Sequence, residues 1–324
     1  MDDTFASHRL SLDRIAQAAR IIDPVFLNTP QFECEPLSRE LGCRLTLKLE
    51  TANPIRSFKG RGADCFVKTD PQVVPGTTLV CATAGNWGQA LAWVCRARDL
   101  PLVVYSATTA NPLKLQRMRE MGAEVRLHSD DFDSAKAEAK RFAQQAGVPF
   151  VEDGREASIA EGAGTIGLEL LQRGARFDAV LLPLGNGALL TGVARWVKAH
   201  SPLTQVVGVS ARGADAMERS WREERLVDRP RVQTIADGIA VRVPVPEAVQ
   251  DMRGLVDDVV LVDDETTVEA MRLLFRHGGW LVEPAGAVGV AALHADRVRW
   301  RGARVATVLC GSNLTAEQIA CWLA

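Results

Sequence analysis

The chain has 324 residues, 47% hydrophobic and 24% charged, which is an ordinary composition for a globular protein of one large or two medium domains. Its 38 basic and 40 acidic residues are well mixed and give a formal net charge of -2, so nothing indicates a nucleic acid or an anionic membrane as partner. No apolar run could span a bilayer, and residues 1–5 begin no secretory signal. The seven cysteines form no CxxC pair and the five histidines show no zinc-type spacing, so we expect reduced thiols, a cytoplasmic protein and no metal.

The predicted elements alternate between helices and strands. Apolar residues at helical spacing predict a helix over residues 9–21, and residues 44–50 alternate as a half-buried strand does. Further strands are expected at 78–82, 102–105, 124–127, 149–151, 179–184, 206–209, 259–262 and 305–309, and helices at 89–99, 112–121, 133–146, 158–173 and 190–200. Residues 212–248 are rich in charge and proline and are expected to be surface connections.

This alternation is typical of parallel sheets covered by helices. The fold class we expect is α/β, with two open, mostly parallel twisted sheets, helices on both faces and an active-site cleft between a large and a small domain. The small domain is placed at residues 56–149, and the large domain is built from residues 1–55 and 150–324.

One lysine lies in a context suited to covalent chemistry. Lys59 stands between Phe58 and Gly60 in the run SFKGRGA, where glycines let other atoms approach the backbone closely. The aromatic neighbour helps to exclude water, and a partly desolvated ammonium loses its proton more readily, as a Schiff-base lysine must. The alternative is a solvated lysine near a helix start, with Ser57 as a capping residue.

Three glycine-bearing turns follow predicted strands, and ligands of open parallel sheets bind at those carboxyl ends. The turns at 83–87 and 185–189 each open a helix, so their free amide hydrogens can bind a carboxylate or a phosphate. The second turn lacks the Walker lysine and the dinucleotide spacing, which favours the phosphate of a small cofactor over ATP or NAD. The third turn covers residues 309–313, where Cys310 is alternatively a buried small hydrophobic residue. Glu283 lies just before another predicted helix and can equally be a charge of that helix's first turn. Purely structural turns are the alternative throughout.

In this order and spacing, these segments resemble the pyridoxal-phosphate enzymes of the serine/threonine dehydratase family, which includes serine racemase and belongs to the tryptophan-synthase-like fold. The similarity extends from the Asn-Thr-Pro at 28–30 to the Gly-Ser-Asn at 311–313. Residues 161–165 and 236–238 also look like family landmarks.

The resemblance implies a role for each of these residues. Lys59 would hold the cofactor as a Schiff base and act as the base at Cα, while Phe58 would pack beside the pyridine ring. Cys310 would face the pyridine nitrogen. Asn86 would hydrogen-bond the 3-hydroxyl group, the substrate carboxylate would bind at Thr83, Ala84, Gly85, Asn86 and Trp87, and the cofactor phosphate would bind at Gly185, Asn186, Gly187, Ala188 and Leu189.

The implied activity is that of a pyridoxal-phosphate-dependent ammonia-lyase (dehydratase). A β-hydroxy amino acid such as L-threonine or L-serine would lose water by α,β-elimination to give an aminoacrylate, which takes up water and hydrolyses to a 2-oxo acid and ammonia. A thiol cannot stabilise a pyridinium as a carboxylate would, which favours elimination over transamination. One alternative is another β-elimination or β-replacement (synthase-like) enzyme. It would need a site for a second or a phosphate-bearing substrate, and the sequence shows no basic cluster near the lysine beyond Arg56 and Arg61. The other is a non-catalytic amino-acid or cofactor-binding homologue. A homodimer with an amino-acid substrate, and with no nucleic acid or membrane partner, is implied.

Four features depart from the family pattern. The usual tetraglycine loop reads Gly-Asn-Gly-Ala at 185–188, and Trp87 replaces a histidine or a small residue. Ala84 replaces the serine that protonates the second face in serine racemase, so racemisation is not expected. Ser210 replaces a glutamate that helps to bind a structural cation, which leaves Asp215 without that partner.

Overall fold

The computed structural model describes residues 8–323, so the segment examined for a secretory signal lies outside the described residues. The strands are β1 (Gln31–Glu33), β2 (Arg44–Leu49), β3 (Leu79–Ala82), β4 (Leu102–Ser106), β5 (Glu124–Leu127), β6 (Ala179–Pro183), β7 (Gln205–Ala211), β8 (Asp258–Val262) and β9 (Arg304–Leu309). The α-helices are α1 (Leu12–Ile21), α2 (Glu35–Leu41), α3 (Lys59–Thr69), α4 (Asn86–Arg96), α5 (Pro112–Glu120), α6 (Phe132–Ala146), α7 (Ala157–Leu170), α8 (Ala188–His200), α9 (Ala216–Arg222), α10 (Pro246–Met252), α11 (Asp264–Gly278), α12 (Pro284–Ala295) and α13 (Ala316–Leu323).

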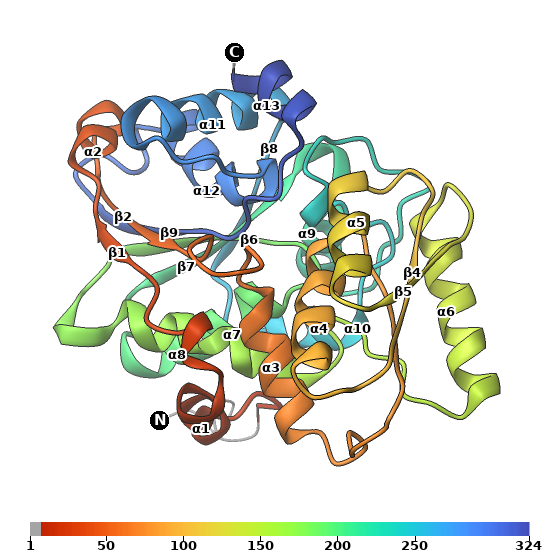
Figure 1. Cartoon of the computed structure of the whole chain (residues 1–324). Helices are drawn as coiled ribbons and strands as arrows, with labels where there is room; N and C mark the ends of the chain where they lie inside the picture. The colour runs from red at the N-terminus through yellow and green to blue at the C-terminus, as the bar shows by residue number, and fades with distance from the viewer. Residues whose placement is uncertain (1–7, 324) are drawn as a thin grey trace.

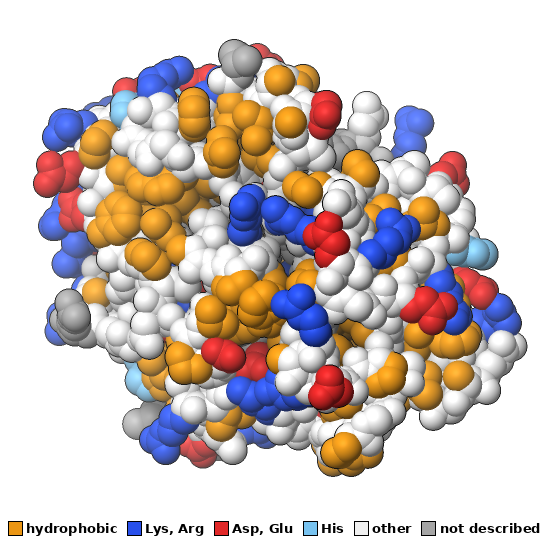
Figure 2. All heavy atoms as spheres, in the orientation of Figure 1, with side chains coloured by type: hydrophobic (Ala, Val, Ile, Leu, Met, Phe, Trp, Pro, Cys, Tyr) orange, Lys and Arg blue, Asp and Glu red, His pale blue; other side chains and the backbone are white. Residues whose placement is uncertain are grey.

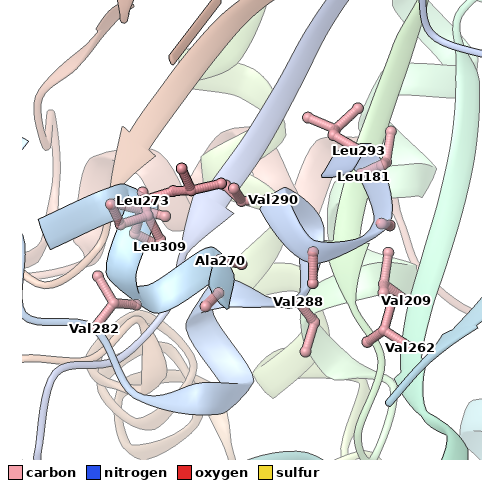
Figure 3. Close-up of a cluster of buried hydrophobic side chains, with 14 of the residues drawn as sticks. Leu181, Val209, Val262, Ala270, Leu273, Val282, Val288, Val290, Leu293 and Leu309 are labelled. Carbon is pink, nitrogen blue, oxygen red and sulfur yellow. The ribbon is translucent and has the colours of Figure 1, made fainter. Parts of the chain in front are cut away.

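The larger sheet has six strands in the order β1-β2-β9-β6-β7-β8, and only the edge strand β1 runs antiparallel to its neighbour. Successive side chains of a strand point to opposite faces, and both faces of this sheet are covered by helices. In β6, Leu181 packs into a hydrophobic cluster with α11 and α12, which Figure 3 shows in close-up. Its neighbours Val180 and Leu182 pack with α7 and α8 on the opposite face (Figure 1).

The smaller sheet has three parallel strands in the order β3-β4-β5. Leu79 and Cys81 of β3 pack with residues of α3 and α4, whereas Val80 between them packs against α6. The strand predicted at 149–151 is reduced to a single parallel bridge between Val80 and Phe150. The fold-class prediction, with two mostly parallel sheets, is confirmed. The domain boundaries stay a prediction.

The prediction of surface connections over residues 212–248 is wrong in part. This segment contains α9 and a 3-10 turn (Asp237–Ile239), and it buries Met217, Ala236 and Ile239 in the two cores of the larger sheet. The many charges misled the prediction because all of them except buried Glu218 are at least partly exposed, while several of the apolar residues between them are buried.

Glycines hold α3, α7 and α8 in backbone contact. A Cβ added at Gly162 would lie 2.6 Å from the Arg61 carbonyl oxygen, and one added at Gly192 would lie 1.9 Å from the Ala160 carbonyl oxygen. No side chain larger than hydrogen fits at either position without moving a helix. The landmark segment 161–165 is therefore part of a helix-packing seam.

Charged side chains of both signs are interspersed on the face drawn in Figure 2, in keeping with the mixed charge of the sequence. Among the described residues, no helix is long and apolar enough to cross a membrane.

Candidate active site

A cavity of about 500 Å³ opens between the smaller sheet and the loops that follow β6 and β9. It brings together most of the residues singled out in the sequence: Phe58, Lys59, Thr83, Ala84, Gly85, Asn86, Trp87, Asn186 and Cys310. The remaining ones, Gly185, Gly187, Ala188 and Leu189, lie behind the cavity wall and are buried.

Lys59 is the first residue of α3, and its position is set by the end of β9. Ser57 forms an antiparallel bridge with Gly311, and the Phe58 amide donates to the Cys310 carbonyl oxygen at 3.1 Å. The Lys59 amide donates to Ser57 Oγ at 3.4 Å, but the N-cap residue of α3 is Phe58 and it makes no side-chain cap bond, so only the helix start of the alternative interpretation is present. The lysine side chain, however, is only 15% exposed, so the solvated lysine of that interpretation is wrong.

The Lys59 ammonium faces a carboxylate that the sequence did not reveal. Its Nζ donates to Asp153 Oδ2 and lies 4.6 Å from the centroid of the Phe58 ring. Asp153 follows the predicted strand at 149–151, as the other site turns follow theirs, and Gly154 comes next. An acidic residue and a glycine at the carboxyl end of a strand were therefore the available signal.

The turn before α4 is organised by the Thr83 hydroxyl. Thr83 Oγ1 accepts the amide hydrogens of Gly85 at 2.9 Å and Gly88 at 3.2 Å, while Ser106 Oγ donates to the Thr83 carbonyl oxygen. These bonds aim the amino-terminal end of α4 at the cavity, where its free amides favour an anion.

Asn86 is held by a polar network rather than free in the cavity. Its Nδ2 donates to both carboxylate oxygens of Glu283 at 3.0 Å, and Asn313 Nδ2 donates to its Oδ1 at 2.8 Å. Glu283 precedes α12 but makes no cap bond with its side chain, which is buried. It is thus a partner of Asn86 and not a first-turn helix charge.

Lys114 completes this network from α5. Its Nζ donates to Asp237 Oδ2 at 2.7 Å and to Glu283 Oε2 at 3.0 Å. Burial alone would lower the pKa of the Lys114 ammonium, but the charges of Glu283 and Asp237 raise it above the ordinary lysine value. Sequence reasoning missed Lys114 because a lysine in a charged helix is usually a surface residue.

The turn at 185–187 is enclosed by backbone on both sides. A Cβ added at Gly185 would lie 3.0 Å from the Gly238 carbonyl oxygen, and Gly187, with φ +95°, precedes the first residue of α8. Asn186 is the member of the turn that lines the cavity. The first amides of α8 lack partners within their helix, which suits a phosphate.

The Cys310 thiol stays neutral at physiological pH. Burial, assisted by the nearby Glu283 charge, raises the pKa of Cys310 to about 12. A pocket amine, two helix amino termini and a neutral thiol around one cavity fit pyridoxal phosphate.

Arg61 lies beneath the site rather than in it. The guanidinium is fully buried and donates to both oxygens of Glu50 and of Glu169 at 2.6 to 2.9 Å. Lys48 Nζ contacts Glu169 Oε2 at 2.5 Å, which balances the two carboxylates with two cations. Arg56 is exposed, so neither arginine forms the basic ligand cluster that a phosphate-bearing substrate would need.

The residues considered for a structural cation have other partners. Ser210 Oγ donates to the Leu184 carbonyl oxygen at 3.0 Å, and Asp215 pairs with Arg229 Nε at 2.9 Å. Within residues 8–323, no group of three or more His, Cys, Asp or Glu side chains is arranged to hold a metal ion.

Comparison with known proteins places the chain in a family. A family model described as "pyridoxal-phosphate dependent enzyme" matches residues 22–311. The L-threonine ammonia-lyase of Geobacter sulfurreducens is 34% identical over 282 residues, covering 87% of this chain and 70% of that protein. A threonine deaminase from "T.th." is structurally similar with a TM-score of 0.87 and 31% identity, covering 94% of this chain and 99% of the other. Maize serine racemase gives a TM-score of 0.87 and 27% identity, with 96% of both chains covered.

The chain spans 50% to 77% of the length of the curated threonine dehydratases and ammonia-lyases that it matches. The expected resemblance and the expected cofactor are both confirmed by these matches. The chain therefore belongs to the pyridoxal-phosphate-dependent enzymes, in their serine/threonine dehydratase family.

Proposed function

We propose that the chain is an ammonia-lyase that converts a β-hydroxy amino acid such as L-threonine or L-serine to a 2-oxo acid and ammonia. The observation that carries this proposal is the convergence of Lys59, Cys310, the turn at 83–87 and Asn186 of the turn at 185–189 on one cavity. The L-threonine ammonia-lyase and threonine deaminase names of its relatives support the same reaction.

Pyridoxal phosphate supplies an electron sink for negative charge at the substrate Cα. In the proposal, Lys59 holds the cofactor and then serves as the base at Cα, and Phe58 shields the lysine from water. The amides of residues 83–87 bind the substrate carboxylate, and those of residues 185–189 bind the cofactor phosphate. Neutral Cys310 faces the ring nitrogen and gives up no proton to it.

The proposed bond from Asn86 to the cofactor hydroxyl requires an exchange. Both polar ends of the Asn86 amide are already engaged by Glu283 and Asn313. A bond to the cofactor therefore replaces one of these contacts. The gain in affinity from Asn86 is correspondingly small, because one hydrogen bond is traded for another.

Trp87 is the residue we propose to limit the substrate side chain. It is buried beside the carboxylate turn and lines the cavity. Its indole Nε1 has no hydrogen-bond partner among the described residues, so the ring is free to act as a bulky wall.

The test is release of 2-oxo acid from a panel of L- and D-β-hydroxy amino acids by the purified protein loaded with pyridoxal phosphate. Lys59→Ala is expected to abolish both turnover and the visible absorbance of the lysine-bound cofactor. Lys68→Ala, at the other end of α3 and paired with Asp64, is the matched control and keeps both. If no amino acid of the panel releases a 2-oxo acid although the protein keeps the visible band of the bound cofactor, the proposed lyase activity is wrong and the cofactor assignment still holds.

We also propose a cytoplasmic homodimer whose two domains comprise residues 56–149 and residues 1–55 plus 150–324. The smaller sheet lies entirely within the first range, and all seven cysteines are free thiols. Exposed apolar side chains near the β1 edge, Phe32 and Leu281, support a contact between copies. Light scattering at micromolar concentration would give twice the mass of one chain for the dimer, and the mass of one chain would exclude it.

A further inference from the structure

The Lys59–Asp153 ion pair lies in the cavity, and one carboxylate oxygen of Asp153 has no hydrogen-bond partner among the described residues. The two side chains are only 15% and 7% exposed, and Lys59 Nζ donates to Asp153 Oδ2. The other oxygen, Asp153 Oδ1, is buried and has no hydrogen-bond partner within the described residues. A buried carboxylate without a full set of partners favours keeping a positive charge beside it.

The backbone holds this carboxylate in place. Phe150 is bridged to Val80 at the edge of the smaller sheet, three residues before Asp153. On the other side Gly154 has φ +93°, and a Cβ there would lie 2.2 Å from the Asn186 carbonyl oxygen. Asp153 is therefore fixed between the small sheet and the turn proposed to bind the phosphate.

Apart from the exposed Asp130 and Arg231, the other charged groups of the cavity are paired elsewhere. Glu152 pairs with Lys136 at 2.8 Å and with Lys140 at 2.7 Å, and Glu283 is engaged by Asn86 and Lys114. Arg242 of the opposite loop pairs with Asp131 and Asp133 at the start of α6, Asp237 pairs with Lys114, and the Cys310 thiol is neutral. Among these carboxylates, Asp153 is the one in contact with Lys59 Nζ.

We propose that Asp153 is a positioning residue that keeps a proton on Lys59 Nζ while that nitrogen is joined to pyridoxal phosphate. The proposal rests on the proposed function, because it takes Lys59 to be the cofactor lysine. An opposite charge in contact favours the protonated form, so Asp153 sets the pH range in which the lysine-bound cofactor remains in its protonated, visibly coloured form.

The test is a spectrophotometric pH titration of the protein loaded with pyridoxal phosphate. In Asp153→Asn, the loss of the protonated band is expected at a pH about one to three units lower than in the wild type, which is the usual effect of one adjacent charge. Asp130→Asn is the matched control, because Asp130 lines the same cavity, is exposed and makes no contact with Lys59. It is expected to titrate as the wild type does.

Asp153→Glu, which keeps the carboxylate, restores the wild-type transition if the effect is electrostatic, and circular dichroism checks that each variant is folded. A folded Asp153→Asn protein that titrates like the wild type would overturn the inference and leave the proposed function intact. An Asp153→Glu protein that titrates as low as Asp153→Asn would overturn it as well. Wild-type protein without any visible band would overturn the proposed function, and the inference with it.

Discussion

Replacing Arg61 by methionine tests whether the buried charges beneath the site support α3. The substitution keeps most of the side-chain volume but removes the donors to Glu50 and Glu169. Glu169 still has the ammonium of Lys48 at 2.5 Å, whereas the Glu50 carboxylate keeps only the hydroxyl of Thr29 at 2.6 Å within the described part of the chain. One fully buried carboxylate is thus left without a cation.

Removing one partner of a buried ion pair costs about 3 to 5 kcal/mol, so the free energy of unfolding of Arg61→Met is expected to fall by about that amount at neutral pH. The loss is measured from urea unfolding followed by far-ultraviolet circular dichroism, with the slope held in common.

Two further variants make the result specific. Adding Glu50→Gln to Arg61→Met removes the stranded charge and is expected to recover about half or more of the loss. Arg39→Met, at an exposed pair with Glu35 at 3.7 Å, should leave the urea midpoint unchanged. A loss below about 1 kcal/mol for Arg61→Met would refute the reasoning, since it would mean that water reaches these carboxylates.

Three more predictions concern the wall of the cavity and the buried charges. In Gly154→Ala, the added Cβ would lie 2.2 Å from a backbone oxygen, so pyridoxal-phosphate binding is expected to weaken at least about tenfold in an equilibrium titration. Gly76→Ala is the control, because Gly76 has φ +82° but open space around it. This variant should lower stability without changing the affinity for pyridoxal phosphate. Iodoacetamide at pH 8 should label exposed Cys321 quickly and Cys310 very slowly. A thiol with a pKa of about 12, as for Cys310, is only about one part in ten thousand thiolate at that pH. Rapid labelling of Cys310, detected by mass spectrometry, would contradict the burial of this thiol. Burial raises the pKa of Glu169, but the charges of Arg61 and Lys48 lower it by more, so the folded-state pKa lies below 4.5. The contribution of Glu169 to stability is therefore present above about pH 4.5 and is lost as the pH falls through the folded-state pKa. The Tm of the wild type should fall more steeply with acid in that range than the Tm of Glu169→Gln.

Five strands of the larger sheet were predicted because each carries its own signal, whereas the three-residue edge strand β1 was not predicted. The apolar run at 179–184 became β6, Ala179–Pro183, since burial on both faces demands an unbroken apolar segment. Helix α11 was missed although Asp263 caps it and Ala270, Met271 and Leu274 are buried at helical spacing. A helix over that stretch was predictable from the sequence alone.

Contacts between distant segments were not predictable in this way. Asp153 and Lys59 are 94 residues apart, and Lys114 reaches Glu283 across 169 residues. No periodicity encodes such pairs, because they depend on how the two sheets are brought together. The buried state of Arg61 was hidden for the same reason, since its carboxylates come from two other elements.

The glycine seam between α3, α7 and α8 has a consequence for how the enzyme can change. Lys59 and Ala188 begin two helices that both rest on α7 through main-chain contacts such as that of Gly192 with the Ala160 carbonyl. The distance between the starts of α3 and α8 is then fixed by main-chain contacts, because no side-chain rotamer lies between the packed helices at these glycines. If Trp87 limits the substrate side chain as proposed, replacing it would change the substrate preference without altering this helix spacing.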